Sequence, residues 1–84
     1  ECVSLDTSKK ITNSLSIPTI GIGSSKYCDG QVLVIDDILK LNSHNKKPKF
    51  VKNYINIEKN IDKAVKSFAK EVINKNFPSK KYSY

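Results

Sequence analysis

Short apolar clusters alternate with longer polar stretches along this chain, and the spacing within each cluster predicts the secondary structure. The run 17–22 is β-branched and apolar at both alternations, with Pro18 near its start. This pattern predicts a strand over 19–23 that is buried on both faces, as in a parallel sheet. Gly21 and Gly23 mark a point where the backbone turns or approaches something closely. The rest of the chain is organised around this strand.

A short surface helix is predicted before the strand, because apolar residues recur near helical spacing over 6–15. Ser4 and Asp6 are its candidate caps, and the residues before Pro18 end it. Helix, turn and strand in this order form the repeating unit of α/β folds. If 1–3 ends a preceding strand, two parallel strands direct their carboxyl ends to the same face.

The segment after the strand is predicted to be helical over 29–39, with Asp29 as its N-cap. Its apolar residues 32–35 taken alone would also suit a strand. Asp36 and Asp37 are expected to face outward. Capping and solvation, rather than metal binding, are the expected roles of these three aspartates.

Two helical patterns occupy the second half of the chain. Pro48 is expected at the first position of a helix that carries Phe50, Val51 and Tyr54. A longer amphipathic helix is predicted over 57–73, with lysines and acids on its polar face. Its apolar stripe consists of Ile57, Ile61, Ala64, Val65, Phe68, Val72 and Ile73. Phe77-Pro78 ends this pattern, and 79–84 is expected to be a polar tail.

The net charge of +7 suggests a nucleic-acid partner at first sight. All fifteen basic residues are lysine, however, and without arginine the chain lacks the bidentate fork that recognises guanine and phosphate. The lysines are spread from Lys9 to Lys81, which favours a solvated surface. A lysine-rich module that binds nucleic acid or an acidic partner stays open as an alternative.

Residues that commonly bind metals or form disulfides are few. Cys2 and Cys28 have no metal-type spacing and are too few for a disulfide framework. Both lie beside apolar or β-forming residues, so they are expected to be reduced, hydrophobic thiols in a cytoplasmic protein. His44, in the polar loop 42–47, is expected to be solvated rather than a ligand or base. The sequence shows no signal peptide or membrane span.

Length also bears on the fold. A chain of 84 residues holds one small domain with a marginal core. It begins with Glu1 and contains no methionine, and a buried parallel strand needs neighbours on both sides. The chain is therefore expected to be part of a larger domain.

Five ordered blocks together resemble the ketopantoate hydroxymethyltransferase family, also called 3-methyl-2-oxobutanoate hydroxymethyltransferases. The resemblance covers essentially the whole chain, and the blocks stand in the family's order and spacing. The blocks are Glu1-Cys2-Val3, 15–23, 28–34, 47–52, and Phe77-Pro78 with the aromatic end of the tail.

The fold implied by this resemblance is α/β, the C-terminal portion of a (β/α)8 TIM barrel of the phosphoenolpyruvate/pyruvate type. Residues 1–84 would then be one piece of a single barrel domain: the end of strand 7, helix 7, strand 8 and the C-terminal helices. Glu1 would end the seventh strand and 17–23 would form the eighth. Both strands would end on the face where barrel enzymes keep their chemistry.

The reaction implied by the resemblance transfers a hydroxymethyl group from 5,10-methylenetetrahydrofolate to 3-methyl-2-oxobutanoate and gives 2-dehydropantoate. A Mg²⁺ ion chelates the keto acid in the family, and its ligands are expected in earlier strands, outside this chain. The glutamate of the Glu-Cys-Val motif, Glu1 here, is the implied base. The implied partners are these small molecules and further copies of the full-length enzyme, with no nucleic acid or membrane. The 84 residues alone are expected to be inactive.

The chain also departs from the family's usual pattern. Ser4 replaces a proline, Asp36 a histidine, and 82–84 the ending His-Ser-Phe. Ser24 and Ser25 replace Ala-Gly, so their side chains either narrow the approach to the active face or point to solvent. Another keto-acid enzyme of the same superfamily is a further alternative.

Overall fold

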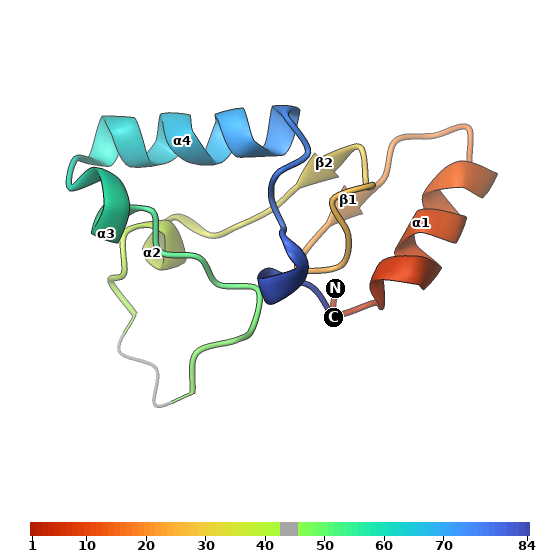
Figure 1. The fold of residues 1–84 in the computed structure, drawn as a ribbon, viewed down its shortest axis with the longest axis horizontal. Helices are drawn as coiled ribbons and strands as arrows, with labels where there is room; N and C mark the ends of the chain where they lie inside the picture. Colours follow the sequence, from red (N-terminus) through yellow and green to blue (C-terminus); the bar gives the residue numbers. More distant parts are fainter. Residues whose placement is uncertain (43–45) are drawn as a thin grey trace.

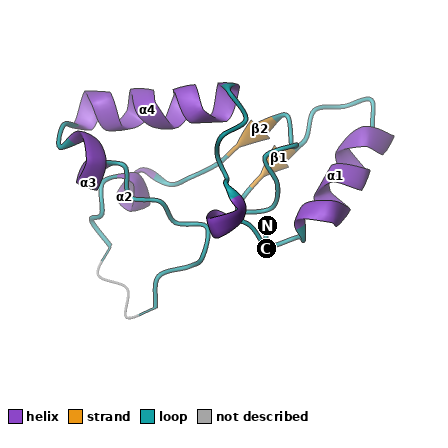
Figure 2. Ribbon diagram, viewed as in Figure 1, coloured by secondary structure: helices purple, strands orange, loops and turns teal. Residues whose placement is uncertain are grey.

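The computed structural model of the chain describes residues 1–42 and 46–84. A two-stranded parallel sheet lies between helix α1 (Leu5–Ser14) and helix α4 (Ile61–Ile73), and the short helices α2 (Ile35–Ile38) and α3 (Ile55–Glu58) lie beside α4 (Figures 1 and 2). The solvated state predicted for His44 lies outside the described residues. The elements are α1 (Leu5–Ser14), β1 (Ile20–Gly21), β2 (Gly30–Gln31), α2 (Ile35–Ile38), α3 (Ile55–Glu58), α4 (Ile61–Ile73) and a 3₁₀ helix, η1 (Lys80–Tyr82).

Helix α1 confirms the helix predicted over 6–15. Ser4 is its N-cap and accepts a hydrogen bond from the backbone N–H of Thr7 at 3.3 Å. Such a cap stabilises a helix by about 1 kcal/mol, because it satisfies an N–H that has no partner inside the helix. The helix ends at Leu15, which is extended. A hydroxyl contact of 2.9 Å between Thr12 and Thr19 then joins the helix to the start of the sheet.

The helix predicted over 29–39 is wrong for its first half, where strand β2 pairs with β1. Gly30 N–H donates to Thr19 O at 3.0 Å and Val32 N–H donates to Gly21 O at 2.9 Å. Asp29 is not an N-cap, because its carboxylate accepts the Thr19 N–H at 2.8 Å. This bond, with the Thr19 hydroxyl, holds the pKa of Asp29 below its ordinary value. Only the short α2 is helical.

The prediction that the strand is buried on both faces is also wrong for this chain. Ile17 is 65% exposed and Ile20 is 61% exposed, whereas Gly21 and Gly23 are buried. Strand β1 is two residues long and has one partner strand, so no described element covers the isoleucine side chains.

Two helix boundaries in the second half also differ from the prediction. No helix starts at Pro48, where a single turn is closed by Val51 N–H to Pro48 O at 3.1 Å. The helix predicted over 57–73 is broken because Lys59 has φ 53° and Asn60 caps α4 through a 3.1 Å bond from Lys63 N–H. The last thirteen residues of the predicted helix are confirmed as α4.

The core is built on one face of α4. Ala64 is fully buried there, while Ile61 and Ile73 at the two ends of the helix are exposed. Tyr54 and Phe77 contact each other edge to face, with ring centroids 6.1 Å apart, a favoured aromatic arrangement. The buried cluster consists of Leu33, Ile38, Tyr54, Ala64 and Phe77, with Leu39, Phe50, Ile55, Phe68, Val72 and Tyr82 partly buried against it.

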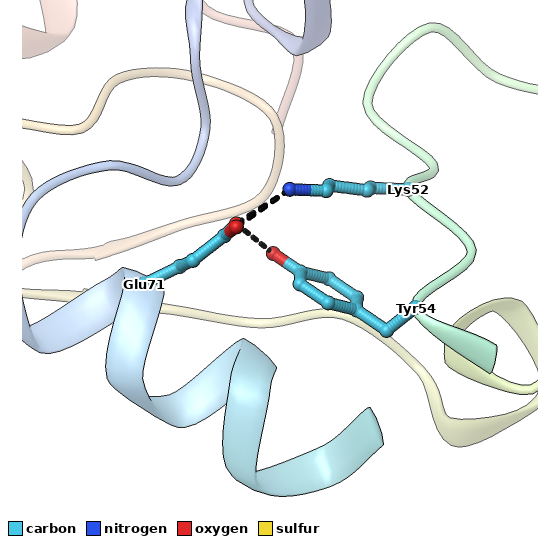
Figure 3. A network of polar contacts seen from close by, with 3 residues as sticks. All are labelled: Lys52, Tyr54 and Glu71. Atoms are coloured by element: carbon cyan, nitrogen blue, oxygen red, sulfur yellow. Dashed lines mark hydrogen bonds and ion pairs between the residues drawn. The ribbon is translucent and has the colours of Figure 1, made fainter. Parts of the chain in front are cut away.

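A polar network attaches the segment before α3 to α4 (Figure 3). The Glu71 carboxylate receives the Lys52 ammonium at 2.7 Å and the Tyr54 hydroxyl at 2.6 Å. Burial and the Glu71 carboxylate raise the pKa of Tyr54 above its ordinary value. The Lys52 and Glu71 side chains are only 17% and 28% exposed, so the Lys52 ammonium depends on the Glu71 carboxylate as its charged partner.

Glu71→Gln should therefore destabilise the full-length protein by about 1–2 kcal/mol, because the amide leaves the half-buried Lys52 ammonium without a charged partner. Asp62→Asn is the matched control. Its partner Lys66 and Asp62 itself are 75% and 70% exposed, and such a pair contributes less than about 0.5 kcal/mol. Denaturant midpoints measure both variants. Equal midpoints for the two variants would contradict a structural role of the Glu71 network.

Candidate functional site

A cavity of about 170 Å³ lies where the two parallel strands end. Its walls come from the residues that directly follow β1 and β2, together with the first residue of the chain. The carboxyl ends of parallel strands are where open α/β sheets bind ligands. We call it the Glu1 cavity; its lining residues are Glu1, Ile22, Val32, Leu33, Val34, Asp37 and Phe50.

Glu1 is placed in this wall by the backbone that follows it. Cys2 N–H donates to Ile22 O at 3.3 Å, so the first residues lie beside the carboxyl end of β1. Segment 1–3 has no strand of its own in the structure; the strand end predicted for it stays a prediction. The Glu1 side chain is exposed at the mouth of the cavity, where a ligand can reach it.

Asp37 is a second carboxylate in the same wall, and sequence reasoning missed it. The expectation that it faces outward is wrong, because the residue is only 8% exposed. Asn42 Nδ2 donates to its carboxylate at 3.1 Å, and Asn53 Nδ2 donates to its backbone oxygen at 2.6 Å. Asp36 beside it is exposed, as expected. The sequence of two adjacent aspartates does not indicate which side chain is buried. The path of the backbone through α2 determines that it is Asp37.

A second cavity, of about 250 Å³, lies between α1 and the sheet and also reaches Glu1. Ser24 lines it, and Ser25 is fully buried, so the alternative in which these side chains point to solvent is wrong. The Ser25 hydroxyl accepts Tyr27 N–H at 3.1 Å. Both cysteines are free thiols; Cys28 is buried and Cys2 is exposed.

Gly23 connects the Glu1 cavity with the end of the chain. Its φ of 63° lies in the left-handed region, and a side chain there would overlap Phe50. Its carbonyl oxygen accepts Tyr84 N–H at 3.3 Å, so the tail ends beside the first residues, as Figure 1 shows. In the polar tail, Ser83 is only 3% exposed and donates to Ser79 O at 3.0 Å, whereas Ser79, Lys80, Lys81 and Tyr84 are exposed.

The described residues do not form a metal site. Nowhere in 1–42 and 46–84 do three or more histidine, cysteine or acidic side chains come together in a group that could hold an ion. These residues therefore do not fit the Mg²⁺ ion that the resemblance implies. Within the same ranges, no helix has the length and apolar character that crossing a membrane requires.

Comparison with known proteins decides the relationship. A family model described as ketopantoate hydroxymethyltransferase matches residues 1–80. The chain belongs to this family. The 3-methyl-2-oxobutanoate hydroxymethyltransferases of Pelagibacter ubique and Thermosipho melanesiensis are 54% and 50% identical to it, over all 84 residues. The enzyme of the same name from Buchnera aphidicola is also 50% identical over the whole chain.

Membership of the ketopantoate hydroxymethyltransferase family confirms the resemblance found in the sequence. The chain covers 32%, 31% and 32% of these three relatives, so it spans about a third of the curated proteins it matches. The parallel pairing of β1 and β2 makes the chain an α/β unit, which agrees with the predicted fold class.

Proposed function

We propose that the full-length protein transfers a hydroxymethyl group from 5,10-methylenetetrahydrofolate to 3-methyl-2-oxobutanoate, giving 2-dehydropantoate for pantothenate biosynthesis. The names of relatives that match the whole chain support this reaction. One structural observation supports the assignment of a role: Glu1 lies at the mouth of a cavity at the carboxyl ends of two parallel strands.

Residues 1–84 would form the last part of a (β/α)8 barrel in this proposal. Segment 1–3 is the end of strand 7, α1 is helix 7, and β1 belongs to strand 8, followed by the C-terminal helices. The helix-then-strand order and the contact between Cys2 and Ile22 support this placement. The Glu1 cavity would then open on the face that carries barrel active sites.

Glu1 acts as the base in the proposed mechanism. Its carboxylate takes the proton from C3 of 3-methyl-2-oxobutanoate, and the C–H electron pair passes into the enolate. Water adds to the methylene carbon of the folate and its two C–N bonds break, so that tetrahydrofolate leaves with both protons of the water and formaldehyde remains. C3 of the enolate then forms a bond to the formaldehyde carbon, and the resulting alkoxide takes back the proton held by Glu1. The apolar walls formed by Ile22, Val32 and Phe50 limit the access of water to the enolate.

Other parts of the full-length enzyme would supply what these residues lack. The Mg²⁺ ion would polarise the keto acid and would be held by residues outside this chain. The two free thiols support a reducing, cytoplasmic location, and the exposed apolar side chains of β1 and α1 support contacts with the rest of the barrel or with further copies.

The full-length protein should form 2-dehydropantoate from the two substrates, whereas the isolated 84 residues should form none, because residues 1–42 and 46–84 hold no metal site and most of the barrel wall is missing. The measurement is product formation, together with exchange of the C3 proton of 3-methyl-2-oxobutanoate into ²H₂O. Exchange of a different keto acid in preference to this one would favour another enzyme of the superfamily. Turnover by the isolated segment would contradict the requirement for the remaining barrel.

A further inference from the structure

We propose that Tyr84 is a positioning residue for Glu1: its ring and backbone hold together the segments that form the wall around the base. The inference rests on the proposed function, since it needs Glu1 to be the base. Tyr84 is 44% exposed and is not among the residues that line the Glu1 cavity. It therefore acts through its neighbours and not on the substrate.

The first link runs through the backbone. Tyr84 N–H donates to Gly23 O at 3.3 Å, and Cys2 N–H donates to Ile22 O, also at 3.3 Å. Consecutive carbonyl groups at the end of β1 thus hold the two ends of the chain next to each other. Glu1 is one residue from this junction, so its direction depends on how tightly the junction is held.

The second link runs through the rings. The Tyr84 and Phe50 centroids lie 6.4 Å apart at an interplanar angle of 55°, within the range of favourable aromatic pairs. Phe50 lines the Glu1 cavity and also occupies the space where a Gly23 side chain would lie. Tyr84 therefore packs against a side chain that also lines the Glu1 cavity.

The third link is polar. The Lys49 ammonium lies 5.7 Å from the centroid of the Tyr84 ring, a cation–π distance. The pKa of Tyr84 is raised, first by a hydrogen bond to the Cys2 side chain and then by burial, with a smaller contribution from the Glu1 carboxylate. Together with the backbone bonds at Ile22 and Gly23, this shift places the Tyr84 side chain near the first two residues of the chain.

The test uses the full-length enzyme with Tyr84→Ala and Tyr84→Phe. Tyr84→Ala should lower kcat about 10-fold or more with KM for the keto acid within about 2-fold, because small misplacement of a catalytic group costs rate rather than binding. Tyr84→Phe keeps the ring on Phe50 and should restore kcat to within about 3-fold of the original enzyme, the range expected for one lost hydrogen bond. Tyr27→Ala is the matched control: Tyr27 is 40% exposed and also lies beside lysine side chains, and its removal should leave kcat unchanged.

A readout independent of activity is the rate at which iodoacetamide alkylates Cys2, followed by peptide mass spectrometry. The rate should rise several-fold in Tyr84→Ala, while the buried Cys28 stays protected. Unchanged kcat and unchanged Cys2 alkylation in Tyr84→Ala would overturn the inference, as would a loss of kcat matched by Tyr27→Ala or accompanied by a fall in melting temperature. An equal loss in Tyr84→Phe would overturn the role of the ring. If Glu1→Gln is inactive but Tyr84→Ala is not impaired, only this inference fails; if the original enzyme forms no product, the proposed function fails and the inference with it.

Discussion

Replacing Glu1 by glutamine should lower kcat of the full-length enzyme by about 100- to 10,000-fold, the range that positioned general bases contribute. The amide keeps the size of the side chain and its place at the mouth of the Glu1 cavity, but it cannot accept the C3 proton. KM for 3-methyl-2-oxobutanoate should change little, because the lost interaction is made only in the transition state of proton transfer and not with the bound substrate. Exchange of the C3 proton should fall by the same factor, because it reports the same step.

Glu58→Gln makes the same chemical change elsewhere in the chain. Glu58 ends the short helix α3 and lines neither of the cavities that reach Glu1. This control should keep the kcat of the original enzyme. A Glu1→Gln variant with comparable turnover would exclude Glu1 as the base, whereas lost turnover with intact proton exchange would move its role to the later one-carbon step.

Gly23→Ala should be the most damaging small substitution in the structure. The backbone at Gly23 is left-handed, with φ 63°, and the new methyl group would overlap Phe50, whose Cγ and Cδ1 would lie 2.6 and 2.8 Å from it. Left-handed strain costs about 1–2 kcal/mol and forced displacement in a filled interior about 1–3 kcal/mol. We expect a loss of about 2–5 kcal/mol in stability, together with reduced kcat, because Phe50 lines the same cavity as Glu1.

Gly30→Ala separates this local cause from a general effect of adding a methyl group. At Gly30 the nearest atom is Ile20 Cδ1 at 2.9 Å, the far end of a side chain that is 61% exposed and can turn away. Its cost should stay below about 1 kcal/mol. Denaturant midpoints and kcat are measured for Gly23→Ala and Gly30→Ala. Equal midpoints would show that the Phe50 side chain can move aside at little cost in stability.

The helices differ in how far their sequences predicted them. Helix α1 carries its own stop and start, with Ser4 as N-cap and Pro18 beyond its end, so local signals were sufficient. The long helical pattern was predicted one turn too early, because Asn60 is a stronger N-terminal signal than the apolar Ile57 before it. The period of the apolar residues shows which face of a helix is buried, but the capping residue decides where the helix begins.

The helix predicted over 29–39 was wrong in its first half for a different reason. Its apolar spacing suits a helix or a strand, and the choice depended on whether the Asp29 carboxylate would cap its own helix or bind a distant N–H. Thr19, ten residues earlier, donates its backbone N–H to that carboxylate. Asp29 therefore does not cap a helix, and Gly30 and Gln31 pair with β1. The spacing of apolar residues within 29–39 cannot reveal a hydrogen-bond partner that lies ten residues earlier.

The sequence by itself determined the family, the α/β class, the first helix and most of the long helix; Glu1 as the base stays a prediction. These follow from local residue patterns and from the order of the motifs, which can be recognised without knowing any tertiary contact. Only the tertiary structure decided that Asp37 turns inward, that Ser24 and Ser25 are buried, and that Tyr84 returns to Gly23. Each of these depends on residues far apart in the chain meeting at the end of β1, and the free energy of such contacts lies in the packing, not in the spacing of either partner.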